Sequence, residues 1–263
     1  MRNSQAGPVL KTVVLATANK RETSAVFDVL KSTTGNSDPK FVGRDTNLPR
    51  YESTFSCING NVRLAITQAD ETGGDEAVDL LKRIVEEVDP DAVFFVGCAA
   101  LLDEKEKIEP NTVYLARRGY DSDNGELRNG QATYDMDQHP GDLRVRRVFS
   151  QLGPSGFFEP VNLVTNRDFI SGSVFLADRN AQRRHDLVGR YPADAVVLEM
   201  ETFAVYKELF RLRTYGWQGS VSVIKGISDV GDENAQIGKE KSQRLATKNA
   251  ATVIMQFLNE VGG

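Results

Sequence analysis

Apolar runs of strand length alternate with helix-period segments along most of the chain. The run "KTVVLAT" (11–17) has the continuity of a buried strand, and "KRETSAVFDVLK" after it fits a helix. In "DEAVDLLKRIVEEVD" (75–89) apolar side chains recur on one helical stripe until Pro90 stops the helix. "DAVFFVG" (91–97) is then typical of a strand covered on both faces. This alternation predicts an α/β fold.

Turn signals divide the rest of the chain into further elements. Asn59 and Gly60, between two strand-like runs in 53–68, predict a hairpin. Further strands are expected at 111–117, 161–166, 194–198 and 220–226, and helices at 141–151, 178–190, 200–213 and 239–260. The Gly-, Ser- and Pro-containing segment 33–50 and the aperiodic polar segment 119–140 are expected to be surface loops.

No repeat and no linker interrupts this pattern. A chain of 263 residues, of which 40% are hydrophobic, can bury a sizeable core. We therefore predict a single domain over residues 1–263, with a central mixed β-sheet flanked by helices. Residues 1–10 are expected to form a flexible N-terminal extension.

Composition and charge narrow the class of partner. The net charge of -5 and the pI of about 5.3 give no basic field that would favour nucleic acid or an anionic membrane. The apolar stretches are shorter than the ~20 residues of a membrane helix, and the N-terminus lacks the apolar core of a signal peptide. The two cysteines, Cys57 and Cys98, are too few for a disulfide framework. We predict a cytoplasmic protein.

Two carboxylates stand where a strand passes into a helix, in "VVLEMETFAVYKELF" (196–210). Glu199 and Glu201 flank Met200 there, at the kind of strand end where open α/β sheets bind ligands. Such a pair can hold a metal, act as acid and nucleophile in glycoside hydrolysis, or accept hydrogen bonds from a sugar diol. No histidine lies near in the sequence, which argues against the metal site. The helix dipole would explain one of the two acids but explains both poorly.

A second strand end, in "VIKGISDVGDENAQ" (223–236), carries Ser228 and Asp229. An aspartate in this position suits acid–base catalysis if partial burial raises its pKa. An Asx turn or a helix cap would also explain it.

Small residues follow the strand at 91–97. Gly97, Cys98 and Ala99 would let a ligand come close, although tight packing of strand against helix explains them as well. The chain has none of the motifs of P-loop, dinucleotide-binding, esterase or CxxC redox sites.

Five segments together carry a family resemblance. They are "TANKRE" (17–22), "DAVFFVGCAALL" (91–102), "ISGSVF" (170–175), "VVLEMET" and "VIKGISDVGDE". In this order they resemble the purine nucleoside phosphorylase/nucleosidase superfamily, and most of all its methylthioadenosine/S-adenosylhomocysteine nucleosidase branch. The resemblance covers roughly residues 11 to 260, and its specific part is E-M-E after one strand with I-S-D after the next. It implies a nucleoside phosphorylase-like fold, no cofactor, no metal, and a homo-oligomer (a dimer or larger) in which a neighbour closes the site.

The resemblance also implies roles for individual residues. Asp229, steadied by Ser228, would protonate N7 of a purine. Glu22 would position the hydrolytic water, and Glu201 would bind the ribose 2′- and 3′-hydroxyls with Met200 packed beneath the sugar. The other implied positions are a supporting acid (Glu199), a ring stacked on the base (Phe175), backbone along the base edge (Val174, Ser173) and a loop on the water or anion side (Gly97, Cys98, Ala99).

These roles fit the chemistry of N-glycosidic cleavage. Breaking the bond builds positive charge on the ribose and negative charge on the departing purine. A proton on N7 makes the base a neutral leaving group, and nearby carboxylates stabilise the cationic sugar. The sequence therefore predicts hydrolysis of a purine nucleoside, with adenine as the first candidate base, such as methylthioadenosine or S-adenosylhomocysteine.

Two residues favour water over phosphate as the attacking group. The charge of Glu22 would repel phosphate, and Cys98 stands where the family usually has a hydroxyl residue. Arg21, beside Glu22, argues the other way because it could point inward and hold phosphate. A phosphate-dependent phosphorylase therefore stays an alternative.

The group on the ribose 5′ position stays open. Ser173 replaces the usual Asp, and residues 68–77 differ from the family's 5′-pocket segment. A nucleotide N-glycosidase would need a phosphate ligand, and the candidates are Arg44, Arg50, Arg117 and Arg118.

A module that binds nucleosides without catalysis is the third alternative, because a fold does not fix a function. The aromatic residues Tyr215 and Trp217 are candidates either for contacts between subunits or for core anchors.

Overall fold

The computed structural model of the chain describes residues 10–34, 39–43, 46–102, 104–109, 111–128, 131–134, 136–173, 180, 182–232 and 236–262, with the backbone alone for 34, 125–128, 131–134 and 154. Its helices are α1 (Lys20–Thr34), α2 (Gly74–Val88), α3 (Leu143–Leu152), α4 (Gln182–Arg190), α5 (Thr202–Thr214) and α6 (Lys239–Val261), with a 3-10 turn at Gly153–Ser155. Its strands are β1 (Thr12–Thr17), β2 (Lys40–Val42), β3 (Arg50–Cys57), β4 (Gly60–Gln68), β5 (Ala92–Leu101), β6 (Thr112–Asp121), β7 (Gly125–Arg128), β8 (Gln131–Tyr134), β9 (Gln138–Pro140), β10 (Asn162–Ser171), β11 (Ala195–Glu199) and β12 (Ser220–Asp229).

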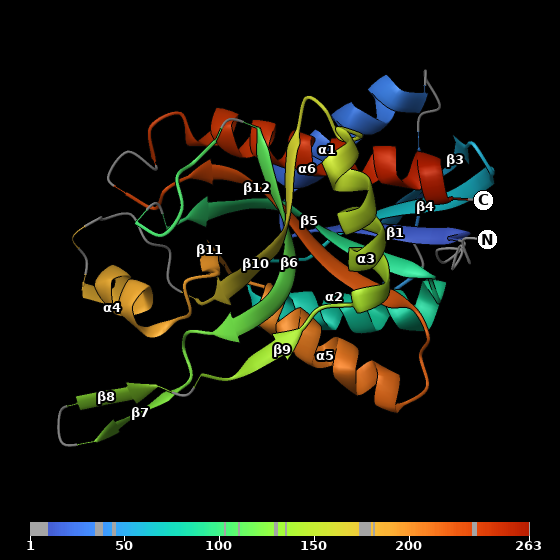
Figure 1. Ribbon diagram of the computed structural model, residues 1–263. Coiled ribbons are helices and arrows are strands. Elements are labelled where there is room, and N and C mark those ends of the chain that lie inside the picture. The colour runs from blue at the N-terminus through green and yellow to red at the C-terminus, as the bar shows by residue number, and fades with distance from the viewer. Residues whose placement is uncertain are drawn as a thin grey trace, which may run out of the picture.

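Two sets of parallel strands, running in opposite directions, build the sheet (Figure 1). Strands β4, β1, β5 and β12 form one set, and β6, β10 and β11 form the other. The sets meet where β12 pairs antiparallel with β6. Strands β3 and β2 extend the first set as antiparallel neighbours, and β9 pairs with β6. The predicted mixed sheet is confirmed.

The sheet also curls back on itself. Strand β11 pairs antiparallel with β5, so that Val197 lies opposite Leu101 and Leu198 opposite Ala100. Since both pairings involve the last residues of each strand, the carboxyl ends of β5 and β11 lie side by side although the strands belong to opposite sets. The curl therefore brings the acids after β11 next to the small residues of β5.

Helices cover both faces of the sheet. In Figure 1, α1, α3 and α6 lie on one face and α2 and α5 on the other. Phe94, Phe149 and Phe257 pack in the first core, where the last two rings stack with centroids 4.0 Å apart. Helix α4 stands apart at the edge where the strands end, and Leu187 packs there against Ile170 in a third, smaller cluster.

Most elements lie where the pattern predicts them, including the hairpin of β3 and β4 around Asn59 and Gly60. Both predicted loops are wrong in part. Segment 33–50 contains β2, and segment 119–140 contains the end of β6, the β7–β8 hairpin and β9. These strands need no buried apolar face, since β2 and β9 are short edge strands and the hairpin pairs only with itself and projects from the body of the molecule (Figure 1).

The ends of the described chain lie together. Leu10 is 1% exposed and forms an isolated parallel bridge with Gly262. The predicted N-terminal extension is therefore wrong at Leu10, which belongs to the core, while residues 1–9 lie outside the described residues. Among the helices that the structure describes, none is both long and apolar enough to cross a membrane.

Candidate functional site

A cavity opens where the carboxyl ends of β1, β5, β10, β11 and β12 meet. The residues that line it include Ala18, Asn19, Glu22, Cys98, Ala99, Ile170, Leu187, Leu198, Glu199, Met200, Glu201, Lys225, Ser228 and Asp229. Glu22, Glu201 and Asp229, which are far apart in the sequence, thus share one cavity.

A lysine lies among buried carboxylates in this cavity. The Nζ atom of Lys225 lies 3.0 Å from Oε2 of Glu201, and the two side chains are 3% and 7% exposed. Burial alone would lower the pKa of Lys225, but the charges of Glu201, Glu22 and Glu199 raise it above its ordinary range. Burial alone would raise the pKa of Glu201, but Lys225 lowers it below its usual value. Glu201 is therefore held as a carboxylate inside the protein.

Lys225 is not among the residues predicted from the sequence. A signal was present, because a lysine interrupts the apolar run of "VSVIKGI" (221–227). A charge in a strand covered on both faces needs a buried partner of opposite sign.

Glu22 reaches the cavity from the first turn of α1. Its Oε2 accepts the N–H of Ala18 at 2.9 Å, and its Oε1 accepts the N–H of Cys98 at 3.0 Å. Its carboxylate therefore accepts hydrogen bonds from backbone N–H groups near the ends of both β1 and β5. Burial raises the pKa of Glu22. The positive charge of Lys225 lowers it, and repulsion from Glu201 raises it further, so that the pKa lies above its ordinary value. A carboxylate with a raised pKa is a stronger base than an exposed one.

Arg21 and Glu22, at the start of α1, point to different sides of the helix. Asn19, just before the helix, accepts hydrogen bonds from the N–H groups of Arg21 and Glu22 through its side-chain oxygen, at 3.0 and 3.1 Å. Arg21 points outward and pairs with Glu240 at 2.7 Å, with both side chains more than half exposed. The structure thus places Arg21 away from the cavity.

Gly97, Cys98 and Ala99 lie within β5 and not in a loop, which corrects the sequence prediction. The strand continues because β12 stays paired with these residues, with Lys225 opposite Gly97, Gly226 opposite Cys98 and Ile227 opposite Ala99. A Cβ at Gly97 would lie 2.2 Å from Oε1 of Glu22, so glycine is what makes room for the carboxylate. Burial raises the pKa of the Cys98 thiol, and the negative charge of Glu22 raises it further. The thiol therefore stays protonated.

Glu199 holds the start of α5. It accepts a hydrogen bond from the Ser171 hydroxyl at 2.5 Å and from the N–H groups of Glu201 and Thr202 at 2.8 and 3.0 Å. Burial, and next repulsion from Glu201, raise its pKa to about 7. Glu199 therefore fixes the backbone that carries Glu201, and its role as a supporting acid stays a prediction.

Asp229 ends β12 with both carboxylate oxygens engaged. The Ser228 hydroxyl donates to Oδ2 at 2.7 Å, and the N–H of Gly231 donates to Oδ1 at 2.8 Å. The Ser228 hydroxyl also lies 3.3 Å from the carbonyl of Ala99, on the neighbouring strand. The predicted contact between Ser228 and Asp229 is present in the structure.

The predicted base-binding residues are only partly described. Phe175 and Val174 lie outside the described residues. Ser173 is exposed, and its N–H donates to Asp123 at 2.5 Å. An apolar wall of Ile170, Leu187 and Leu198 lines the cavity nearby. None of these three was predicted as a site residue, because α4 and the ends of β10 and β11 reach the cavity only through the tertiary fold.

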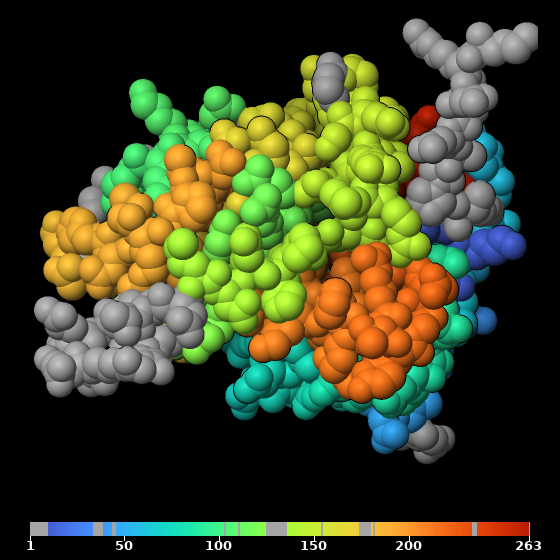
Figure 2. All heavy atoms as spheres, turned by 60° about the horizontal axis from the view of Figure 1, so that its bottom comes forward, coloured from blue at the N-terminus to red at the C-terminus, as the bar shows by residue number. Residues whose placement is uncertain are grey.

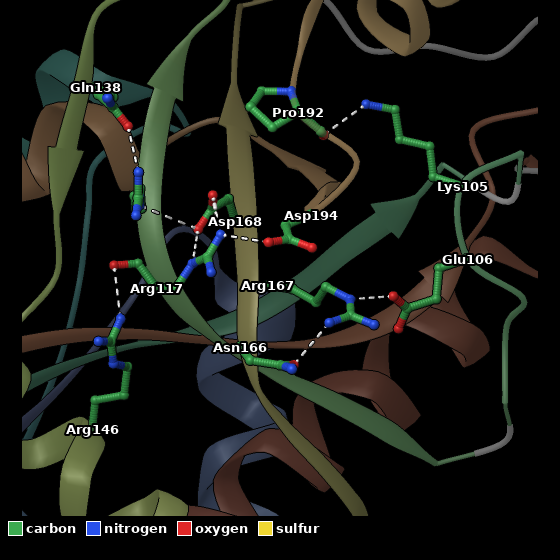
Figure 3. Close-up of polar contacts among 11 residues, drawn as sticks. Lys105, Glu106, Arg117, Gln138, Arg146, Asn166, Arg167, Asp168, Pro192 and Asp194 are labelled. Atoms are coloured by element: carbon green, nitrogen blue, oxygen red, sulfur yellow. Dashed lines mark hydrogen bonds and ion pairs between the residues drawn. The ribbon is translucent and has the colours of Figure 1, made fainter.

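Arg117 and Arg118 do not line the cavity. Figure 3 shows Arg117 directed towards Asp168 and Asp194. Arg117 makes two parallel bonds to Asp168, at 2.6 and 2.7 Å, and a third to Asp194 at 3.0 Å. Arg118 donates to Gln138 at 3.0 Å. The contacts of Arg117 link β6 to β10 and to the residue before β11.

The other two arginines predicted as phosphate ligands are Arg50 and Arg44. Arg50 is 9% exposed and pairs with two glutamates on β3 and α2. Arg44 lies outside the described residues. Among the described residues, no group of three or more His, Cys, Asp and Glu side chains is placed to hold a metal ion.

No family model and no curated protein matches this sequence. Solved structures do match. The 5′-methylthioadenosine/S-adenosylhomocysteine nucleosidase of Neisseria meningitidis, in complex with methylthio-immucillin-A, has a TM-score of 0.71 and 19% identity over 95% of this chain and 99% of that one. Futalosine hydrolase of Helicobacter pylori has a TM-score of 0.74 and 13% identity, over 95% and 97%. The chain has the nucleoside phosphorylase/nucleosidase fold.

A further structure of this fold is the 5′-methylthioadenosine/S-adenosylhomocysteine nucleosidase of Colwellia psychrerythraea in complex with adenine. It has a TM-score of 0.73 and 15% identity over 97% of each chain. The nucleoside phosphorylase/nucleosidase fold implied by the sequence resemblance is thus confirmed. At this level of identity the likeness concerns the fold, so the chemistry has to be argued from the cavity itself.

Replacing Lys225 with Met tests its pairing with Glu201. The variant leaves a cluster of buried carboxylates without its ammonium, and removal of one partner of a buried pair typically costs about 3–5 kcal/mol. We expect the free energy of unfolding, measured with urea, to fall by about this amount. Lys82, whose pair with Asp79 is largely exposed, is the control, and Lys82→Met should cost less than about 1 kcal/mol. Equal losses in the two variants would contradict the pairing.

Glu199 should make stability depend on pH. Its pKa is raised from 4.5 to about 7, so the folded state binds this proton more tightly than the unfolded chain. The resulting stabilisation is present below about pH 4.5 and is lost as the pH rises towards 7. Relative to Glu199→Gln, the wild type should lose up to about 3 kcal/mol of unfolding free energy over this range. Urea unfolding of both proteins at pH 4.5, 5.5 and 7 measures the difference, and a constant difference would refute the assignment.

Proposed function

We propose that the chain is a purine nucleosidase that hydrolyses the N-glycosidic bond of an adenine nucleoside. The observation that carries this proposal is the place of Glu22, whose carboxylate occupies the backbone N–H groups of Ala18 and Cys98. A phosphate would need such donors, and the carboxylate would repel it. Water, in contrast, can be held and deprotonated by a buried carboxylate with a raised pKa.

In the proposed reaction the C1′–N9 bond breaks and its electrons pass to the purine. Asp229 donates a proton to N7, so that the base leaves neutral. Glu201, kept ionised by Lys225, binds the ribose hydroxyls and stabilises the positive charge on the sugar. Water then attacks C1′, and Glu22 takes its proton.

The fold and its relatives support this proposal. Solved proteins of this fold are nucleosidases with a nucleoside analogue or adenine bound, and one is a futalosine hydrolase. We put methylthioadenosine and S-adenosylhomocysteine first among substrates and keep other 5′ groups open. None of Arg50, Arg117 and Arg118 lines the cavity, but Arg183 does, so a 5′-phosphate stays among the open groups.

We also propose that a second copy of the chain packs against α5. Figure 2 shows α5, in orange, uncovered beside α2. Phe210 and Tyr215 are 69% and 76% exposed there, and a groove along α5 shares Thr72, Gly172 and Met200 with the cavity. A neighbour on this face would close the cavity's open side. Trp217, by contrast, is partly buried and packs against the core.

Product analysis tests the function. The protein is incubated with purine nucleosides and nucleotides, including methylthioadenosine, with and without phosphate, and base and sugar products are separated. We expect free base and free sugar without phosphate. Strict dependence on phosphate, with a sugar 1-phosphate as product, would make the chain a phosphorylase. Base release from no substrate would leave the nucleoside-binding module.

An Asp229→Asn variant separates catalysis from binding. Loss of the acid should lower kcat about 10²- to 10⁴-fold, while binding of adenine, followed by calorimetry, persists. Asp79→Asn, an exposed change on α2, serves as the control and should keep the wild-type kcat.

Sedimentation velocity tests the oligomer. Phe210→Glu places a charge on the exposed face of α5 and should shift an assembly of the wild type to the monomer. The exposed apolar residue Ile58, 69% exposed on the β3–β4 turn, gives the control Ile58→Glu, which should leave the assembly unchanged. A monomeric wild type would refute this interface.

A further inference from the structure

Arg184 is a buried arginine to which the proposed chemistry gives no task. It lies on α4, and its side chain is 0% exposed. Its Nε and Nη2 atoms donate to the two carboxylate oxygens of Glu104 at 2.6 and 2.8 Å. This two-point pairing fixes the plane of the guanidinium group.

The third nitrogen of Arg184 reaches the loop that follows Asp229. Its Nη1 donates to the carbonyl of Val230 at 2.6 Å and lies 3.2 Å from the carbonyl of Gly231. The N–H of Gly231 in turn donates to Oδ1 of Asp229 at 2.8 Å. Arg184 and Asp229 are thus joined through one short piece of backbone.

The geometry of the peptide bond makes this connection rigid. The carbonyl of Val230 and the N–H of Gly231 belong to the same planar unit and point in opposite directions. Because Arg184 holds the carbonyl end, it also sets the direction of the N–H end. The peptide therefore lies between the guanidinium group at its carbonyl end and the carboxyl group of Asp229 at its N–H end.

We propose that Arg184 is a positioning residue for Asp229, a role that rests on the proposed function. It does not touch the substrate. It sets the Val230–Gly231 peptide, and that peptide sets the orientation of the carboxyl group that delivers the proton. Displacement of a reacting group by about 1 Å can lower a rate about 10²-fold, so the effect appears in turnover.

Helix α4 gives this arrangement a second consequence. Leu187, on the same helix, lines the cavity on the side of the apolar wall. The position of α4 therefore affects both the apolar wall, through Leu187, and the orientation of Asp229, through Arg184. A variant that loosens Arg184 should lower kcat, with a smaller effect on KM.

The test compares Arg184→Met and Arg184→Lys with a matched control. Arg50 is also a buried arginine, paired with Glu52 and bonded to the carbonyl of Leu48, but it lies on β3 away from the cavity. The substrate is the nucleoside that the wild type cleaves fastest. We expect Arg184→Met to lower kcat about 10- to 100-fold with KM changed less than about threefold. Arg184→Lys, which can still donate to the carbonyls, should recover part of kcat, and Arg50→Met should keep it within about twofold.

A second readout does not depend on activity. Amide hydrogen exchange at Val230 and Gly231 should become about tenfold or more faster in Arg184→Met and stay unchanged in Arg50→Met. Circular dichroism checks that each variant is folded, and Glu104→Gln, which weakens the same connection, replaces Arg184→Met if that variant does not fold.

The outcomes separate the two proposals. A loss of kcat no larger than in Arg50→Met, or a rise in KM alone, overturns the positioning role. If the wild type releases no base, the proposed function fails, and hydrogen exchange still tests the connection. Unchanged exchange at Gly231 would then show that Arg184 does not hold the loop.

Discussion

The candidate site depends on one buried ammonium group. Lys225 lies among Glu22 and Glu201, which are nearly removed from water, and the partly buried Glu199. Several carboxylates could not stay ionised together in such a place without a cation, because like charges at short range in a medium of low dielectric constant force one another to take up protons. Lys225 stabilises the ionised form of these carboxylates to different extents. It keeps Glu201 ionised, while Glu22 and Glu199 are left with raised pKa values. One cation thus produces carboxylates of different basicity from the same residue type.

The backbone makes this clustering possible. Parallel strands alone would bring together the ends of β1, β5 and β12, but Glu199 ends β11 and Glu201 follows it, and β11 belongs to the opposite set. The pairing of β11 with β5 joins the two groups, and small residues on β5 leave the space that Glu22 fills. The arrangement suits the proposed reaction, since a cavity with more carboxylates than ammonium groups around the sugar favours positive charge on it.

Local pattern predicted the elements well and the site in part. Buried strands and amphipathic helices have periods that a single sequence displays, and the acids at strand ends were visible because charge is rare beside apolar runs. The strands in 119–140 were missed because a short edge strand and a hairpin that pairs only with itself show no alternating apolar pattern. Leu187 and Arg184 were missed for another reason: what they contact is decided by where α4 sits, and no local pattern contains that information. The resemblance to a family supplied roles for Glu22 and Asp229 that spacing alone left open.

The start of α1 shows how little separates two chemistries on this scaffold. Arg21 and Glu22 are successive residues, about 100° apart around the helix axis, and the side chain of Asn19 fixes which of them faces inward. Insertion of one residue between Asn19 and Arg21 would rotate the arginine towards the place of the glutamate. Under the proposed function, a carboxylate that holds water would be exchanged for a guanidinium group that can hold an anion, while the sheet, the lysine and the other acids stayed where they are. The capping amide of Asn19 therefore decides which side chain faces the cavity, and one added codon would be enough to change that side chain.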